Sequence, residues 1–174
     1  MKLDIKDFLQ SPDYSMEFEG QLIEQNSHYD IDDLNLIMPI DYSGTVFNLG
    51  NEILLDLCVK YKYNTQCDRC LKPMVEIVET NLEAHFFKNL EEVFEDEASI
   101  EYFELEDSQI FLDDLIISQI ITSIPFKSLC DENCKGICPK CGKNLNEGSC
   151  NCNEELEIDP RLGKLMDLFN DEEV

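Results

Sequence analysis

The chain has 174 residues, which is enough for one domain with a substantial core. Its 13 Lys and Arg residues face 38 Asp and Glu residues, so the formal net charge is −25. A surface this negative repels phosphate at long range, which disfavours broad nucleic-acid binding and makes a basic protein the expected partner.

The first nine residues mix charged and apolar side chains and predict a short turn or helix. They lack the apolar core of a secretory signal. The longest uncharged stretch, residues 115–126, is too short and too polar to span a membrane. We therefore expect a cytoplasmic protein, in which clustered cysteines bind metal more often than they form disulfides.

Strand patterns begin at about Tyr14. Apolar and polar residues alternate there with a period of two, which is typical of strands with one buried face. Residues 34–49 continue the pattern, and residues 41–44 are a candidate turn or bulge inside it. Gly50 marks a turn before residues 53–64, which form the clearest strand of the chain.

A returning strand is predicted over residues 75–87, after a break at Lys72-Pro73. Residues 66–73 would then form the tip of a long hairpin. Five residues of the returning strand are candidates for its core side: Val75, Ile77, Leu82, Ala84 and Phe86.

Residues 91–107 hold nine acids and no base. Such a segment is typical of a solvated loop, and a surface for a basic partner is the sharper alternative. Residues 112–124 then show a wide apolar stripe, which predicts a helix buried against the sheet and ended by Pro125. A terminal helix is predicted after Asp159-Pro160, with one apolar face formed by Leu162, Leu165, Met166 and Phe169.

Eight of the nine cysteines lie in four close pairs, with spacings typical of zinc ligands. Gly142 lets the backbone curl after one pair, so that amides can approach the thiolates. Cys58 is left over and is predicted to be a buried strand thiol. The four pairs are Cys67 and Cys70, Cys130 and Cys134, Cys138 and Cys141, and Cys150 and Cys152.

Eight thiols are the right number for two zinc ions with four ligands each. We assign Cys138, Cys141, Cys150 and Cys152 to one site, and Cys67, Cys70, Cys130 and Cys134 to the other. Two alternatives stay open at this point. Cys130, Cys134, Cys138 and Cys141 could form one local site, or Cys67 and Cys70 could be a redox pair.

No catalytic residue is assigned. Sites with four cysteine ligands are closed, whereas a catalytic zinc keeps an open position. His28 and His85 share no motif with the cysteines, and no nucleophile elbow, phosphate loop or dinucleotide fingerprint is present. A thiol redox or zinc-dependent enzyme is therefore the weakest of the functional hypotheses.

One stretch, residues 127–143, is locally basic, with four lysines against two acids. Lys135, Lys140 and Lys143 are the candidate contacts to RNA phosphates or to a partner. The same lysines also offset thiolate charge, so a direct RNA-binding zinc ribbon is an alternative rather than the leading hypothesis.

These motifs resemble the YceD family, the large ribosomal RNA subunit accumulation proteins of bacteria and plastids. The resemblance lies in Cys67-Asp68-Arg69-Cys70-Leu71 with Pro73, in Cys134-Lys135-Gly136-Ile137-Cys138-Pro139-Lys140-Cys141-Gly142, in Cys150-Asn151-Cys152, and in Asp159-Pro160-Arg161-Leu162. It covers residues 59–169 well, whereas the N-terminal third matches only as a β-rich pattern.

The resemblance implies a role in accumulation of large-subunit (23S) ribosomal RNA, and hence in ribosome assembly. Family genes commonly neighbour that of a small, basic zinc-ribbon protein of the large subunit, which would suit a strongly acidic partner. Some relatives lack the distal cysteine-rich ribbon but keep the first cysteine pair and have a His/Cys pair where Cys130 and Cys134 stand, which supports the division into two sites. We therefore expect a basic ribosomal protein or the pre-ribosomal large subunit as partner.

The predicted fold class is α+β. We expect a mostly antiparallel, curved sheet or open barrel with one buried helix, a cysteine-rich zinc module and a terminal helix. Residues 1–129 are predicted to form the β-rich core domain, and residues 130–174 the zinc-binding module with the C-terminal helix.

Overall fold

The computed structural model describes residues 1–24, 26–87, 102–105 and 107–152. A five-stranded sheet forms its body, in the order β2-β3-β4-β5-β6. Strands β2 to β5 are antiparallel, and β6 runs parallel to the end of β5. The strands are β2 (Ser15–Leu22), β3 (Leu36–Asn48), β4 (Glu52–Gln66), β5 (Pro73–Phe87) and β6 (Tyr102–Glu104).

The remaining elements gather beside this sheet. A small antiparallel pair joins the start of the chain to the segment before the long helix. These elements are β1 (Lys2–Asp4), α1 (Lys6–Gln10), the 3-10 turn η1 (Asp32–Leu34), β7 (Gln109–Phe111) and α2 (Leu112–Ser123). The mostly antiparallel architecture is confirmed, and within the described residues the sheet is open because its end strands, β2 and β6, do not pair with each other.

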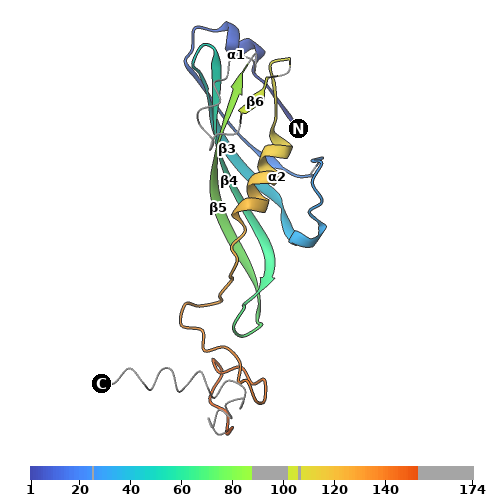
Figure 1. Ribbon diagram of the computed structural model, residues 1–174, viewed down its shortest axis with the longest axis vertical. Helices are drawn as coiled ribbons and strands as arrows, with labels where there is room; N and C mark the ends of the chain where they lie inside the picture. The colour runs from blue at the N-terminus through green and yellow to red at the C-terminus, as the bar shows by residue number, and fades with distance from the viewer. Residues whose placement is uncertain (25, 88–101, 106, 153–174) are drawn as a thin grey trace, which may run out of the picture.

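The hairpin β4–β5 is formed by the two longest strands of the described residues, each of 15 residues. Its strands pair in register from Glu52 with Phe87 to Gln66 with Pro73, so the first cysteine pair lies at its tip. Figure 1 shows the hairpin running down the molecule, with the cysteine-rich segment beyond its lower end. The hairpin tip predicted over residues 66–73 is therefore present.

Helix α2 packs against one face of β4 and β5, which we call the inner face (Figure 1). The Tyr61 hydroxyl lies 3.0 Å from the Ser123 hydroxyl, and the Gln119 amide donates to Thr80 Oγ1 at 2.6 Å and to the Asn81 carbonyl at 3.0 Å. The helix contributes five apolar side chains to the core: Leu112, Leu115, Ile116, Ile117 and Ile120.

The prediction for the core side of β5 was wrong at two positions. Val75 and Ile77 are 51% and 59% exposed, whereas Ala84 and Phe86 are buried. The register of β5 with β4 is continuous, so residues of odd and even number face opposite sides throughout. Apolar character alone does not show which side a residue faces.

Cys58 is half-exposed rather than buried. Its neighbours Leu57 and Val59 are fully buried on the inner face, so strand alternation turns the Cys58 thiol to the opposite, outer face.

Residues 41–44, the candidate turn or bulge, form no turn, because they pair continuously with both β2 and β4. A bulge or irregularity is present at their edge, where the register of β3 with β4 shifts between Ile37 and Asp41. A close contact with neighbouring atoms, rather than a turn, favours glycine at position 44. A Cβ atom there would lie 2.6 Å from the Asp56 carbonyl oxygen and 2.8 Å from the Phe18 ring.

Among the described residues, no helix is long and apolar enough to cross a membrane. The terminal helix predicted after Asp159-Pro160, and most of the acidic segment 91–107, lie outside the residues that the structure describes.

Candidate metal centres

The eight paired cysteines come together as two groups of four, within each of which all sulfurs lie within 4.8 Å of one another. We call them the hairpin cluster (Cys67, Cys70, Cys130 and Cys134) and the ribbon cluster (Cys138, Cys141, Cys150 and Cys152). The structure thus groups the cysteines as the two-site assignment has them. Cys130, Cys134, Cys138 and Cys141 do not form one local site in the structure. Cys67 and Cys70 are not left as a separate pair at the hairpin tip, because they join Cys130 and Cys134.

Two turns of the same shape supply one pair of each cluster. At the hairpin tip, Cys67 N donates to the Lys72 carbonyl at 3.0 Å, and Leu71 N donates to the Cys67 carbonyl at 2.8 Å. In the ribbon, Cys138 N donates to the Lys143 carbonyl at 2.9 Å, and Gly142 N donates to the Cys138 carbonyl at 2.8 Å.

Leu71 and Gly142 occupy equivalent positions in these turns. Their φ angles are +59° and +71°, in the left-handed region. Glycine adopts this region freely, whereas a side chain with a Cβ atom is strained there by about 1–2 kcal/mol. The hairpin turn therefore tolerates a strained leucine where the ribbon turn has the unstrained residue.

Leu71→Gly should leave the free energy of unfolding within about 1 kcal/mol of the parent, because relief of strain offsets the greater freedom of glycine in the unfolded chain. Leu71→Val should lower it by about 1–2 kcal/mol, since a β-branched residue fits the left-handed region worst. Urea unfolding of both zinc-loaded variants measures the difference. Equal destabilisation by glycine and valine would contradict the proposed strain.

Contacts around Asp68 and Arg69 hold the second half of the hairpin cluster in place. Asp68 Oδ2 accepts a hydrogen bond from Ser128 N at 2.6 Å, and Asp68 N donates to the Ser128 carbonyl at 2.9 Å. The Arg69 guanidinium donates to the carbonyls of Glu132 at 3.0 Å and Cys134 at 2.9 Å. The hairpin tip thereby binds the chain that follows α2, through contacts that no sequence motif predicted.

The sulfur positions of the hairpin cluster fit a tetrahedral zinc ion. Zinc bound to four thiolates at about 2.3 Å has sulfur–sulfur edges of about 3.8 Å. Cys67 Sγ lies 3.8 Å from Cys134 Sγ, and Cys70 Sγ lies 3.6 Å from Cys130 Sγ. Cys67, Cys70 and Cys134 are buried, so a bound ion would be largely shielded from water.

The electrostatics of the hairpin cluster also fit a cation. The pKa of Cys67 is lowered to about 6, chiefly because backbone N–H groups of Cys130, Cys70 and Arg69 donate to its sulfur. The pKa of Cys130 is raised to about 12 because the sulfurs of Cys70 and Cys134 lie beside it. Four sulfurs at this spacing repel one another when ionised, and a divalent ion removes that repulsion.

The ribbon cluster repeats this arrangement in a more exposed place. The pKa of Cys138 is lowered to about 6, chiefly by the N–H groups of Cys141 and Lys140, and the pKa of Cys152 is raised to about 12 by the Cys141 sulfur. Cys138 is buried, Cys150 and Cys152 are half-buried, and Cys141 is exposed. Although only one residue separates Cys150 from Cys152, both sulfurs join those of Cys138 and Cys141 in one group of four.

Asn146 connects the two clusters. It lies in the ribbon loop, yet its Nδ2 donates to Cys134 Sγ of the hairpin cluster at 3.2 Å, and its Oδ1 accepts from Lys135 N at 2.8 Å. Leu145 N also donates to the Gly136 carbonyl at 2.9 Å. The ribbon loop thus supports the hairpin cluster. The spacing of the cysteines does not predict this role of Asn146.

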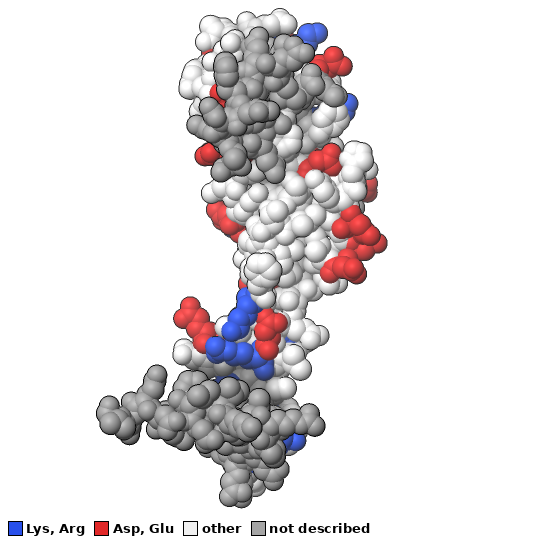
Figure 2. All heavy atoms as spheres, viewed as in Figure 1, with Lys and Arg blue, Asp and Glu red and all other residues white. Residues whose placement is uncertain are grey.

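The candidate contact lysines, Lys135, Lys140 and Lys143, are all exposed. Lys143 Nζ donates to the Ser149 carbonyl at 2.8 Å, so this lysine also closes the ribbon loop. Figure 2 shows blue atoms gathered near the lower end of the molecule, together with acidic ones. The histidines lie elsewhere, with His28 Nδ1 3.3 Å from Asp114 Oδ2 and His85 beside Glu52.

A family model described as "Large ribosomal RNA subunit accumulation protein YceD" matches residues 55–169. The chain belongs to the YceD family. The matched residues include β5, α2 and all eight cysteines of the two clusters. Membership confirms the resemblance seen in the motifs, and the family description concerns large-subunit ribosomal RNA.

Several relatives share part of this YceD-family chain. Uncharacterized proteins of Mycobacterium bovis and Mycobacterium tuberculosis are 32% identical over 110 residues, which is 62% of this chain and 51% of theirs. A chloroplastic "Large ribosomal RNA subunit accumulation protein YCED homolog 1" of Arabidopsis thaliana is 37% identical over 67 residues, or 38% of this chain and 21% of its own. The chain thus spans about half the length of the mycobacterial relatives, and less of the plant one. No solved structure matches it.

Proposed function

We propose that this chain is a non-enzymatic assembly factor that supports accumulation of large-subunit ribosomal RNA in the cytoplasm. The family match across both cysteine clusters carries this proposal. The net charge of −25 favours a basic ribosomal protein, free or within a pre-ribosomal particle, over naked RNA as the partner.

In this proposal each cysteine cluster holds one structural zinc ion, with all eight clustered cysteines as ligands. Four thiolates complete the tetrahedral shell and leave no position for a substrate, which supports a non-catalytic role. Zinc when bound would cross-link the chain segments that carry its ligands. Residues 1–129 would form the core domain and residues 130–174 the zinc module, with the hairpin cluster joining the two.

The isolated protein should contain about two zinc ions and present a single reactive thiol, that of Cys58, because the other eight cysteines are held as ligands. Plasma emission spectrometry measures the metal, and a thiol reagent counts the free cysteines before and after chelation in denaturant. Copurified iron, or two additional reactive thiols in the zinc-loaded protein, would contradict the proposed sites.

A pull-down from cells of the source organism tests the function. The tagged, zinc-loaded chain should retain a basic protein of the large subunit or a precursor particle at physiological salt. Nuclease treatment serves as the control, since a protein contact survives it and an RNA tether does not. Retention of neither protein nor particle would count against the proposal.

Direct RNA binding is the second candidate, favoured by the exposure of Lys135, Lys140 and Lys143. It requires that replacing these lysines by alanine weakens RNA binding and flattens its salt dependence. A chain without affinity for RNA at low salt would remove this candidate and leave the protein-binding role intact.

A further inference from the structure

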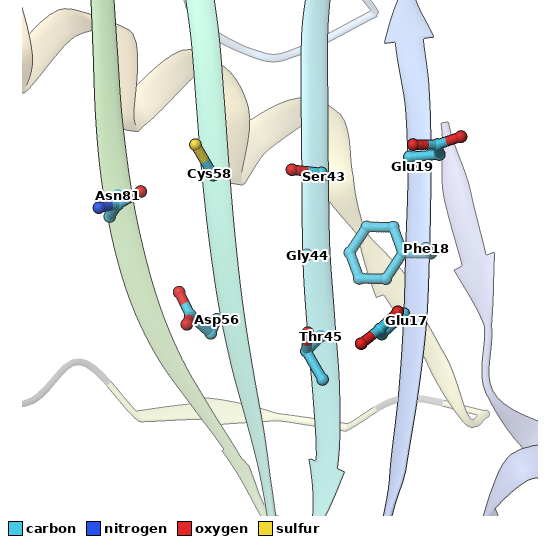
Figure 3. A pocket seen from close by; sticks show the side chains of 9 residues that line it. All are labelled: Glu17, Phe18, Glu19, Ser43, Gly44, Thr45, Asp56, Cys58 and Asn81. Atoms are coloured by element: carbon cyan, nitrogen blue, oxygen red, sulfur yellow. The ribbon is translucent and has the colours of Figure 1, made fainter.

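The outer face of the sheet, opposite α2, has no covering element in the part of the chain that the structure describes. Strand alternation places Leu57 and Val59 in the core and therefore turns Asp56, Cys58 and Lys60 to this face. Figure 3 views this face with α2 behind the strands.

The middle of the outer face is hollow where the short side chains of Ser43, Cys58 and Asn81 lie next to one another on β3, β4 and β5. Glu19, Ser43, Cys58 and Asn81 pair across β2 to β5 as one row. Two adjoining hollows, of about 690 and 530 Å³, share Glu19, Ser43 and Cys58 in their walls. Figure 3 shows the side chains that line the larger one. We call this feature the sheet trough.

Carboxylates flank the row on both sides. One neighbouring row runs Glu17, Thr45, Asp56 and Glu83, and the other runs Gln21, Asp41, Lys60 and Glu79. Lys60 and Lys62 are the only lysines that the described strands place on this face, and these strands hold no arginine. Lys60 Nζ lies 3.8 Å from Glu79 Oε2, so it offsets one of the six acids that the three rows hold when Glu19 is included.

The spacing of these acids favours several separate positive charges over one metal ion. Among the described residues, only the two cysteine clusters bring three or more candidate ligand atoms within 4.8 Å. The trough carboxylates stand on different strands and therefore match a row of charges spread along a chain. The shallow trough would also accommodate the aliphatic parts of lysine and arginine side chains.

We propose that the sheet trough is the docking site for an extended, arginine- and lysine-rich protein segment. The inference rests on the proposed function and adds to it the surface that receives the basic partner. Charge complementarity selects the occupant, because RNA phosphates would be repelled by the same carboxylates.

A synthetic peptide of alternating arginine and glycine serves as the probe, with the full, zinc-loaded chain as its target. The trough variant Glu17→Gln, Glu19→Gln and Asp56→Asn should weaken binding by about tenfold or more and reduce its salt dependence. A control variant changes net charge equally at exposed positions outside the sheet: Asp7→Asn, Asp32→Asn and Asp33→Asn. The control should weaken binding by about threefold or less. Equal loss in the two variants would show general attraction to an acidic chain and overturn the proposal.

Cys58 reports occupancy directly because its thiol lines the trough. Its pKa is raised by burial and by the nearby charges of Glu79 and Asp56, so alkylation is best followed above neutral pH. Bound peptide should slow iodoacetamide modification of Cys58, located by peptide mass spectrometry, by about fivefold or more in the parent chain but not in the trough variant. An unchanged rate with peptide bound, or equal protection by a short RNA, would overturn the proposal.

The two hypotheses fail in different ways. If the pull-down retains no ribosomal partner while the peptide still binds and protects Cys58, the proposed function is contradicted and the proposed docking site in the sheet trough is not. A ribosomal partner retained equally by the parent and the trough variant would support the function and overturn the docking site.

Discussion

Replacing Cys67 by serine should lower the free energy of unfolding by more than about 4 kcal/mol and release one zinc ion, because loss of one ligand leaves three crowded sulfurs at a buried site. Cys67 is fully buried directly after β4, and its cluster joins the hairpin tip to the chain that follows α2. The variant should therefore lose contacts of the core domain itself.

Cys150→Ser is the matched comparison, since it also removes one ligand from one cluster. Cys150 is half-buried and its cluster is built from residues 138–152 alone, so the core should lose less than about 1 kcal/mol. Far-ultraviolet circular dichroism in urea follows the core, and metal analysis follows the clusters. Equal destabilisation by the two substitutions would show that the proposed division into core domain and zinc module is wrong.

Gly44→Ala should destabilise the sheet by about 2–4 kcal/mol, because the new Cβ atom cannot be accommodated without moving backbone. It would lie 2.6 Å from the Asp56 carbonyl oxygen of the adjacent strand and 2.8 Å from the Phe18 ring. The ring can rotate away, whereas the carbonyl belongs to the β3–β4 ladder.

Gly50→Ala provides the control in the same hairpin. Gly50 has a φ of +94°, and no neighbouring atom lies within 4 Å of the position that a Cβ atom would take, so alanine there meets backbone strain without a clash. We expect a cost of about 1 kcal/mol from this strain alone. Thermal unfolding of both variants gives the comparison. A loss at Gly44 no larger than that at Gly50 would contradict the packing explanation.

The grouping of the cysteines was predictable because metal ligands occur in pairs with fixed spacing, and closure of a four-ligand site limits how pairs combine. The hairpin was predictable because alternation and the break at Lys72-Pro73 are local signals. Neither prediction needed knowledge of distant contacts.

Other features depend on such contacts and were missed. Gly44 falls within the candidate turn or bulge of residues 41–44, because glycine marks turns, bulges and close backbone approaches equally well in a sequence. Val75 and Ile77 are exposed although their apolar character favours the core, because strand parity decides which face a residue occupies. Asp68, Arg69 and Asn146 act through hydrogen bonds to backbone or sulfur from distant segments, and single residues of these types carry no recognisable pattern.

The cysteine clusters differ in how much chain must be ordered before each can close. The ribbon cluster gathers its ligands from one short segment, whereas the hairpin cluster must bring Cys70 and Cys130 together across β5, β6, β7 and α2. Loop-closure entropy therefore favours assembly of the ribbon cluster first. Asn146 of the ribbon loop donates to Cys134 Sγ of the hairpin cluster. A ribbon cluster that forms first would therefore hold Cys134 in position before the hairpin cluster closes. We expect zinc uptake during refolding to occur in two kinetic phases, with the slower one limited by docking of the segment that follows α2 on the tip of the β4–β5 hairpin.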